Sequence, residues 1–222
     1  MTLSRLFIGY IRCWALYNFF LLNWRTLIFL TFIKNTDSCR QGKSCTKVCG
    51  IMSISFIINE QLYKQVIEPV ASATSFVWIG TADIKDLHVH YKGTVQSFLC
   101  VLDSLLKKKV AIRLLHAKEP GVNFRKSFDK YPLLWDRMER QLCPRVHFKH
   151  IIVDGKFAYA GSANLTGAGL GIKSSNTRNF ESGFITTDPE MIKDIMNQFD
   201  EVWMGKYCKS CRRKEYCTDP IL

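Results

Sequence analysis

Residues 147–167 read HFKHIIVDGKFAYAGSANLTG, and this stretch decides the fold. Side chains alternate between the two faces of a β-strand, so a strand that begins here places His147 and Lys149 on one face. Asp154-Gly155 stands between two apolar runs and predicts a two-residue hairpin turn of type I′. We therefore expect a tight β-hairpin with polar side chains at its open end.

The predicted turn also determines which residues face each other across the hairpin. A two-residue loop pairs Val153 with Lys156, and His147 then lies directly across from Ser162, with about 5 Å between their Cβ atoms. Asn164 follows two residues later on the same side. The hairpin would thus gather an imidazole, an ammonium, a hydroxyl and an amide. These groups suit a phosphate bound next to a nucleophile.

The same stretch resembles the signature of the phospholipase D superfamily. Residues 147–154 (HFKHIIVD) match its HxKxxxxD pattern, and residues 161–164 (GSAN) match its GSxN continuation. Glu181, in NFESG, is similar to the downstream acidic residue that supports the histidine. The resemblance covers residues from about 56 to 204. It implies a phospholipase D-like α/β fold with one such motif in the chain.

This resemblance implies hydrolysis of a phosphodiester. His147 would attack phosphorus and form a covalent phosphohistidine, and a second histidine would protonate the leaving oxygen and then activate water. Glu181 would orient the imidazole, whereas Asp154 is expected to serve the turn rather than the chemistry. This chemistry needs no metal or other cofactor. The non-bridging oxygens would be held by three side chains, those of Lys149, Ser162 and Asn164.

The superfamily builds its pocket from two such motifs, and this chain has one. The lysine and aspartate of the motif do not follow any of the histidines His88, His90 and His116. Single-motif members resemble half of the larger enzymes and pair as homodimers. We therefore expect a homodimer with its active site on the two-fold axis and one His147 from each subunit.

A strand–helix–strand unit precedes the motif. Apolar runs at 76–84 and 110–117 predict strands, and residues 94–109 show the apolar spacing of a helix. This order predicts a central, mixed but mostly parallel sheet flanked by helices.

The remaining elements follow from similar patterns. Asp188 is the expected N-cap of the last helix, with Pro189 at its first position. The other expected elements are a helix at 59–73, a basic loop at 118–127, a short helix within 128–142, and strands at 146–153, 156–162 and 180–186.

Three segments are expected: an N-terminal extension (1–51), a catalytic domain (52–205) and a basic, cysteine-rich tail (206–222). The extension is strongly apolar over residues 6–33, but Arg12 and Arg25 interrupt the roughly 20 apolar residues that a spanning helix needs. It is either a weak membrane anchor or a dispensable segment. We expect a cytoplasmic protein, associated with a membrane if the extension is part of the functional protein.

The nine cysteines are odd in number and do not resemble a secreted disulfide framework. Cys208, Cys211 and Cys217 have the spacing Cys-x2-Cys-x5-Cys, and Cys143, just before the catalytic strand, could supply a fourth ligand. We expect a structural zinc or iron–sulfur centre that ties the tail to the hairpin. The alternative is a set of free thiols.

The formal net charge of +12 favours an anionic partner. A nuclease acting on DNA or RNA is the first hypothesis. The second is a phospholipase D that hydrolyses phospholipid headgroups at a membrane, supported by residues 6–33. The third is a non-catalytic module that binds nucleic acid or lipid.

Overall fold

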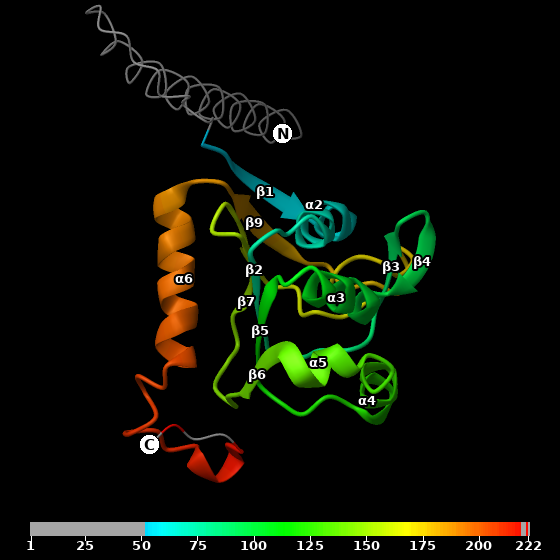
Figure 1. The fold of residues 1–222 in the computed structure, drawn as a ribbon. Coiled ribbons are helices and arrows are strands. Elements are labelled where there is room, and N and C mark those ends of the chain that lie inside the picture. Colours follow the sequence, from blue (N-terminus) through cyan, green and yellow to red (C-terminus); the bar gives the residue numbers. More distant parts are fainter. Residues whose placement is uncertain (1–51, 219–220, 222) are drawn as a thin grey trace, which may run out of the picture. The chain divides into compact units, whose positions relative to one another are not determined.

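Seven strands form the central sheet of the computed structural model, which describes residues 52–218 and 221 (Figure 1). The strands are β1 (Ile54–Ile58), β2 (Phe76–Thr81), β5 (Ala111–His116), β6 (Met138–Leu142), β7 (Lys149–Val153), β8 (Phe157–Gly161) and β9 (Ser182–Thr186). Their order across the sheet is β1-β9-β8-β7-β2-β5-β6, so β7 is the middle strand. A separate hairpin contains β3 (His88–Tyr91) and β4 (Thr94–Ser97).

The sheet is mixed, as expected, but it is not mostly parallel. Parallel pairing is confined to β2–β5 and β5–β6, and the other four of the six neighbouring pairs are antiparallel. The predicted strand–helix–strand unit is correct, because a helix crosses between β2 and β5. From β7 onward the chain continues as a meander whose connections reverse its direction. The four antiparallel pairs are β2–β7, β7–β8, β8–β9 and the edge pair β1–β9. They outnumber the two parallel pairs.

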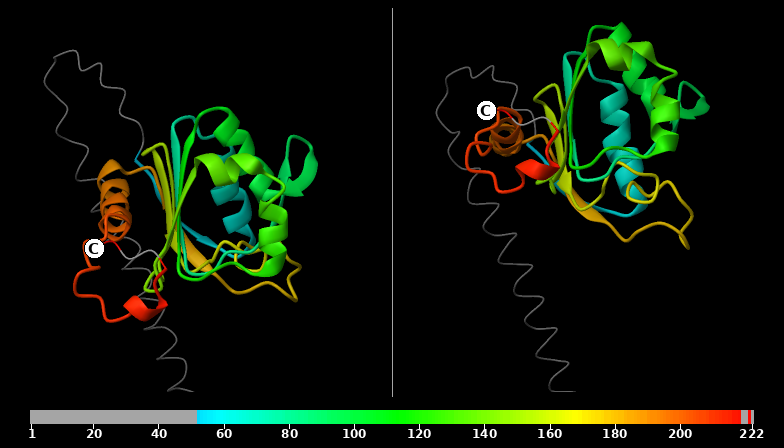
Figure 2. Two further views of the ribbon diagram at one scale, coloured as in Figure 1. Left: turned by 60° about the horizontal axis from the view of Figure 1, so that its bottom comes forward. Right: turned by 90° about the horizontal axis from the view of Figure 1, so that it is seen from below.

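Helices cover both faces of the sheet (Figure 2). Four helices lie on one face: α2 (Glu60–Ala71), α3 (Phe98–Lys107), α4 (Val122–Phe128) and α5 (Pro132–Arg137). The opposite face carries α6 (Pro189–Trp203). Each face has its own apolar core, because a central strand has two faces to bury. On the α6 side this core includes Leu115, Ile152, Ala158, Ile192 and Phe199.

The last helix begins where the sequence predicts. The Asp188 carboxylate accepts hydrogen bonds from the N–H groups of Glu190 (2.9 Å) and Met191 (3.2 Å), and Pro189 occupies the first turn. Phe199 of this helix is fully buried and stacks on Trp78 of β2, with 5.1 Å between ring centroids.

Two segments differ from the expected pattern. Thr94–Ser97 was expected to begin a helix but forms β4, and α3 starts only at Phe98, with the Ser97 hydroxyl accepting from Leu99 N–H. Residues 118–142, expected to hold a loop and one short helix, contain α4, α5 and the edge strand β6. The sequence of β6, MERQL, has no alternating apolar pattern, so its strand conformation comes from pairing with β5.

The hairpin turn confirms one prediction and corrects another. Asp154 and Gly155 have φ values of 54° and 63°, the positive signs that a type I′ turn requires, and Lys156 N–H donates to Val153 O at 3.0 Å. However, Val153 pairs with Phe157, so Lys156 forms a bulge and the register shifts by one residue.

At the open end of the hairpin the shift changes which residues face each other. The last pair is Lys149 with Gly161. His147 precedes this ladder, so the expected pairing of His147 with Ser162 is wrong.

Asp154 fastens the turn to the start of the neighbouring strand β2. One carboxylate oxygen accepts from Thr74 N–H (2.9 Å) and the Thr74 hydroxyl (2.8 Å), and the other accepts from Ser75 N–H (2.7 Å) and Phe76 N–H (2.9 Å). Burial opposes ionisation of Asp154, but these hydrogen bonds outweigh it and hold the pKa of the carboxyl below its usual value. Asp154 is therefore a structural residue, as the turn motif indicates.

Across residues 52–218 and 221 the structure contains no helix that is both long and apolar enough to cross a membrane. The apolar run at 6–33, where the sequence suggests an anchor, lies outside the described residues.

Asp154→Ala should destabilise the fold, because it removes the acceptor of four hydrogen bonds at once. We expect the free energy of unfolding to fall by about 2 kcal/mol at pH 7. Since the pKa of Asp154 is lowered in the folded chain, the contribution is present above the unfolded-state pKa and is lost as the pH falls through the folded-state pKa. Urea unfolding of the full chain at several pH values measures both effects.

The control is Asp194→Ala, at an exposed position on α6. Equal losses in the two variants at pH 7 would contradict the role given to Asp154. If Asp154→Ala lowered the free energy of unfolding by the same amount down to acidic pH, the predicted dependence on the charge of Asp154 would be contradicted.

Candidate active site

His147 and Lys149 meet at the open end of the hairpin. His147 is exposed in the segment before β7, whereas Lys149, the first residue of β7, is 6% exposed. The Lys149 ammonium donates to the backbone carbonyl of His147 at 2.6 Å, and its Nζ lies 3.4 Å from Nδ1 and 3.5 Å from Nε2 of the ring. An exposed imidazole thus lies against a buried ammonium.

Burial lowers the pKa of Lys149, and the charge of Glu181 partly opposes this effect. Glu181 is therefore close enough to act electrostatically on the ammonium, although the two are 32 positions apart in the sequence. The opposite charge favours the protonated form of the lysine, which is the form that binds anions.

Ser162 and Glu181 form the second half of the site. The Ser162 hydroxyl donates to Oε2 of Glu181, and it accepts from Ser182 N–H at 3.1 Å. Oε1 of Glu181 accepts from the Asn179 amide at 2.9 Å. Glu181 was expected to orient His147, but in this structure its carboxylate accepts hydrogen bonds from Ser162 and Asn179. Its support of the histidine stays a prediction.

The backbone of Glu181 is hydrogen-bonded to Asn59, near the start of the described residues. Glu181 N–H donates to the side-chain oxygen of Asn59 (3.1 Å), and Asn59 N–H donates to the Glu181 carbonyl (2.9 Å). Asn59, with φ of 50°, lies between β1 and α2. This double link fixes the carboxylate beside Ser162, and nothing in the local sequence around Asn59 signals it.

Asn164 is fixed at the end of β2. Its side-chain oxygen accepts from Asp83 N–H at 3.1 Å and lies 3.4 Å from the Thr81 hydroxyl, which in turn accepts from Leu165 N–H. These contacts use the oxygen of the amide. The nitrogen of the amide has no hydrogen-bond partner within residues 52–218 and remains a donor for a bound anion.

Tyr159 lies beneath the GSAN segment. It is 1% exposed, and its hydroxyl accepts from Ala163 N–H at 3.3 Å. Burial raises the pKa of Tyr159 to about 12, with the Ala163 hydrogen bond opposing and the Glu181 charge adding to the rise. A Cβ at position 161 would meet the Tyr159 ring and approach Ser182 O at 2.6 Å, so glycine is required there.

The predicted site residues fall into two groups. Lys149 pairs with Gly161, which directly precedes Ser162, so the ammonium, the hydroxyl and the Glu181 carboxylate lie at one end of the hairpin with His147. Asp154 is at the opposite end of β7, a strand that spans about 17 Å. It cannot contact a phosphate bound at His147.

These features define a class of protein: an α/β domain with one histidine–lysine motif on its central hairpin. The chain belongs to the phospholipase D-like family, because residues 66–203, well over half of it, match the family model described as "Cardiolipin synthase, PLD-like domain". No curated protein matches the sequence.

Solved structures show the same fold. NucT from Helicobacter pylori is 16% identical with a TM-score of 0.51, and Nuc, a phospholipase D family member from Salmonella typhimurium, is 15% identical with a TM-score of 0.51. For each, the match covers 68% of this chain and 94% of the other. Phosphatidylserine synthase from Haemophilus influenzae is 13% identical, with a TM-score of 0.51 and coverage of 73% and 41%. At these identities the likeness is one of fold.

His150, next to the site in sequence, has a structural environment. It is 7% exposed, stacks on Phe148 with 4.5 Å between ring centroids, and its Nδ1 has no hydrogen-bond partner among the described residues. Burial lowers the pKa of His150 to about 4, so the ring is neutral at physiological pH.

His150 should make the fold sensitive to acid. Between pH 6.5 and 4 the unfolded chain binds a proton at this residue and the folded chain does not, so stability is lost as the pH falls. The loss amounts to roughly 3 kcal/mol by pH 4. His150→Leu should remove this component, so that its stability declines less than that of the wild type over this interval. Denaturant unfolding between pH 7.5 and 4 tests this, and parallel pH profiles for the two proteins would contradict it.

Proposed function

We propose that this chain is a phosphodiesterase that cleaves DNA or RNA through a phosphohistidine, and that it works as a homodimer. The observation that carries the proposal is the contact of the buried Lys149 ammonium with the exposed His147 ring, at 3.4 and 3.5 Å. The exposed ring can reach a phosphate in solvent, and the ammonium beside it can bind the oxygens of that phosphate.

In the first step a ring nitrogen of His147 attacks phosphorus. An N–P bond forms and the bond to the leaving oxygen breaks, which divides one difficult displacement into two easier ones. Lys149 and the amide nitrogen of Asn164 hold the non-bridging oxygens as negative charge develops on them. Ser162 is a further donor or acceptor whose hydroxyl is oriented by Glu181.

In the second step water attacks the phosphohistidine. A P–O bond forms to the water oxygen, the N–P bond breaks, and His147 is regenerated. Both steps need a second group that donates a proton to the leaving oxygen and then removes one from water. Within residues 52–218 no second histidine follows the motif pattern, so we assign this role to the partner subunit's His147.

Apolar side chains exposed beside the site support pairing of two copies. Phe180, directly before Glu181, is 91% exposed, and Ile58, which pairs with Ser182, is 44% exposed. The outward face of β1 and β9 continues this surface with Ile54, Phe56 and Phe184. Contiguous exposed apolar surface of this kind is typical of an interface.

A basic depression supports a polynucleotide over a single phosphate ester. Arg145, two residues before His147, lines a depression of about 350 Å³ together with Arg212 and Arg213 of the tail. Several cations near a phosphate site can neutralise successive phosphates of one strand. A lipid headgroup offers only one or two charges to such a surface.

His147→Ala should abolish turnover, because it removes the attacking nitrogen. Full-length protein is assayed with EDTA present on labelled single-stranded DNA, on RNA and on phosphatidylcholine vesicles. We expect polynucleotide cleavage that falls at least about 1,000-fold in the variant. The control is Lys156→Ala, which lies at the turn end of the same hairpin and should retain activity.

Each assay distinguishes one alternative. Cleavage of the vesicles alone would replace the nuclease with a phospholipase. Binding of either ligand without turnover in the wild type would indicate a non-catalytic module.

Mixed dimers test the shared active site. If catalysis needs one His147 from each subunit, co-expression of wild-type and His147→Ala subunits in equal amounts leaves only wild-type pairs active, about a quarter of the dimers. Specific activity should then be about a quarter of the wild-type value after correction for total protein. Two independent sites would leave about half. Sedimentation velocity measures the dimer itself, and an active monomer would overturn the proposal.

A further inference from the structure

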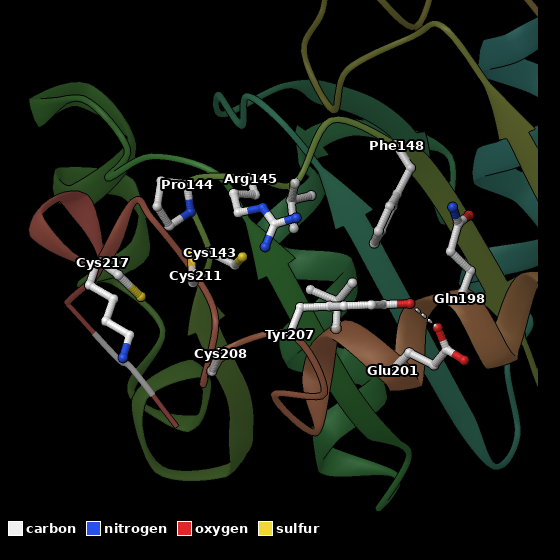
Figure 3. A pocket seen from close by; sticks show the side chains of 13 residues that line it. Cys143, Pro144, Arg145, Phe148, Gln198, Glu201, Tyr207, Cys208, Cys211 and Cys217 are labelled. Carbon is white, nitrogen blue, oxygen red and sulfur yellow. Dashed lines mark hydrogen bonds between the residues drawn. The ribbon is translucent and has the colours of Figure 1, made fainter. Parts of the chain in front are cut away.

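Four cysteines from distant parts of the sequence line one cavity. The cavity has a volume of about 250 Å³ and lies between the segment that follows β6 and the chain that follows α6 (Figure 3). Its lining includes Cys143 from the first segment and three cysteines from the tail, Cys208, Cys211 and Cys217. None of these residues belongs to the catalytic site.

Backbone contacts hold these cysteines in place. Cys143 N–H donates to the His116 carbonyl at 2.9 Å, which fixes Cys143 just beyond β6. The Cys217 thiol lies 3.8 Å from the carbonyl of Leu142, the residue before Cys143. Cys211 N–H donates to the Cys208 carbonyl at 3.1 Å, so these two cysteines lie on one tight turn. The tail therefore returns to the strand end that carries Cys143.

Basic groups lie next to these sulfurs. The backbone N–H of Arg213 donates to Cys211 Sγ at 3.4 Å, and Arg145 and Lys214 line the same cavity as the four cysteines. Several partly buried sulfurs next to one another are stabilised as thiolates when they share a cation.

We propose that Cys143, Cys208, Cys211 and Cys217 bind a structural metal centre through four thiolates. Four sulfur ligands, two of them in a Cys-x2-Cys turn, suit a zinc ion or an iron–sulfur cluster. On binding zinc, each thiol gives up its proton and forms one sulfur–metal bond, so no oxidant is needed. Arg145 and Lys214, which line the same cavity, would offset part of the negative charge of the resulting centre.

The thiols must move to complete the site. Within residues 52–218 no three His, Cys, Asp or Glu side chains are close enough to enclose an ion in this conformation. Zinc needs sulfur at about 2.3 Å. All four side chains line one cavity, so metal binding requires the thiols to turn toward a common centre.

The centre would tie the tail to the segment that leads into the catalytic strand. Cys143 is four residues before His147, and Arg145 lies between them. The metal would hold this segment and the basic residues of the tail in one arrangement. This inference concerns folding and is independent of the proposed hydrolase activity.

The experiment measures metal and sulfide in full-length protein purified under reducing conditions. We expect about one zinc per chain, or iron with acid-labile sulfide, held by these four cysteines. Cys217→Ser should lower the metal content, whereas the control Cys100→Ser should not. Cys100 lies on α3 and its thiol contacts Gln96.

Alkylation followed by mass spectrometry shows which thiols bind the metal. The four cysteines should be protected from alkylation until a chelator is added, and the chelated protein should unfold at a lower temperature. Protection that a reductant removes and a chelator does not would mean a disulfide and overturn the proposal. Equal metal content in the two variants, or thiols that are reactive throughout, would also overturn it.

Discussion

The four hydrogen bonds of the Asp154 carboxylate are the constraint on which the geometry of the site depends. They fasten the turn of the β7–β8 hairpin to the first residues of β2, the strand beside β7. A strand has a period of two residues, so a shift of one position would turn every side chain to the other face. By fixing the register at one end of β7, Asp154 fixes which face receives Lys149 at the other end.

The position of β7 then explains the chemistry available at its start. It is the middle strand, and all five of its residues are buried. A lysine at such a position loses solvent, which lowers its pKa, and nearby negative charge opposes this effect. Glu181, directly before β9, supplies that charge. An incoming phosphate would add to it, so the buried ammonium is prepared for an anion before any ligand arrives.

Sequence patterns predicted the parts of the fold that local chemistry determines. The Asp-Gly turn, the cap at Asp188 and the strand–helix–strand unit all follow from propensities that act over a few residues. The sequence-based predictions were wrong where contacts between distant segments determine the strand register or the secondary structure. Lys156 leaves the ladder although a two-residue turn was expected, and β6 is a strand because β5 pairs with it. The antiparallel half of the sheet depends on β1 and β9 meeting across more than 120 residues.

In the candidate site, too, some residues could be predicted from the local sequence and others could not. The motif predicted His147, Lys149, Ser162 and Asn164 because their spacing is a property of one hairpin and the turn after it. Tyr159, Asn59 and Thr81 were not anticipated, since each acts through a contact with a distant backbone group or through a ring beneath the chain. These residues hold the polar groups of the candidate site in place. The motif thus names the candidate reacting groups, and the contacts that position them are visible only in the folded chain.

A chain with one motif can meet the needs of a two-step displacement only by bringing in another proton carrier. In the proposed mechanism His147 is the nucleophile, and a nitrogen bonded to phosphorus cannot at the same time protonate the leaving oxygen. Glu181 accepts hydrogen bonds from Ser162 and Asn179, and the proposed mechanism assigns Lys149 to the phosphate oxygens. The residues that surround His147 in this chain are therefore already occupied. In the homodimer that we propose, a second copy would supply the missing imidazole, because the same residue would take the other role across the two-fold axis.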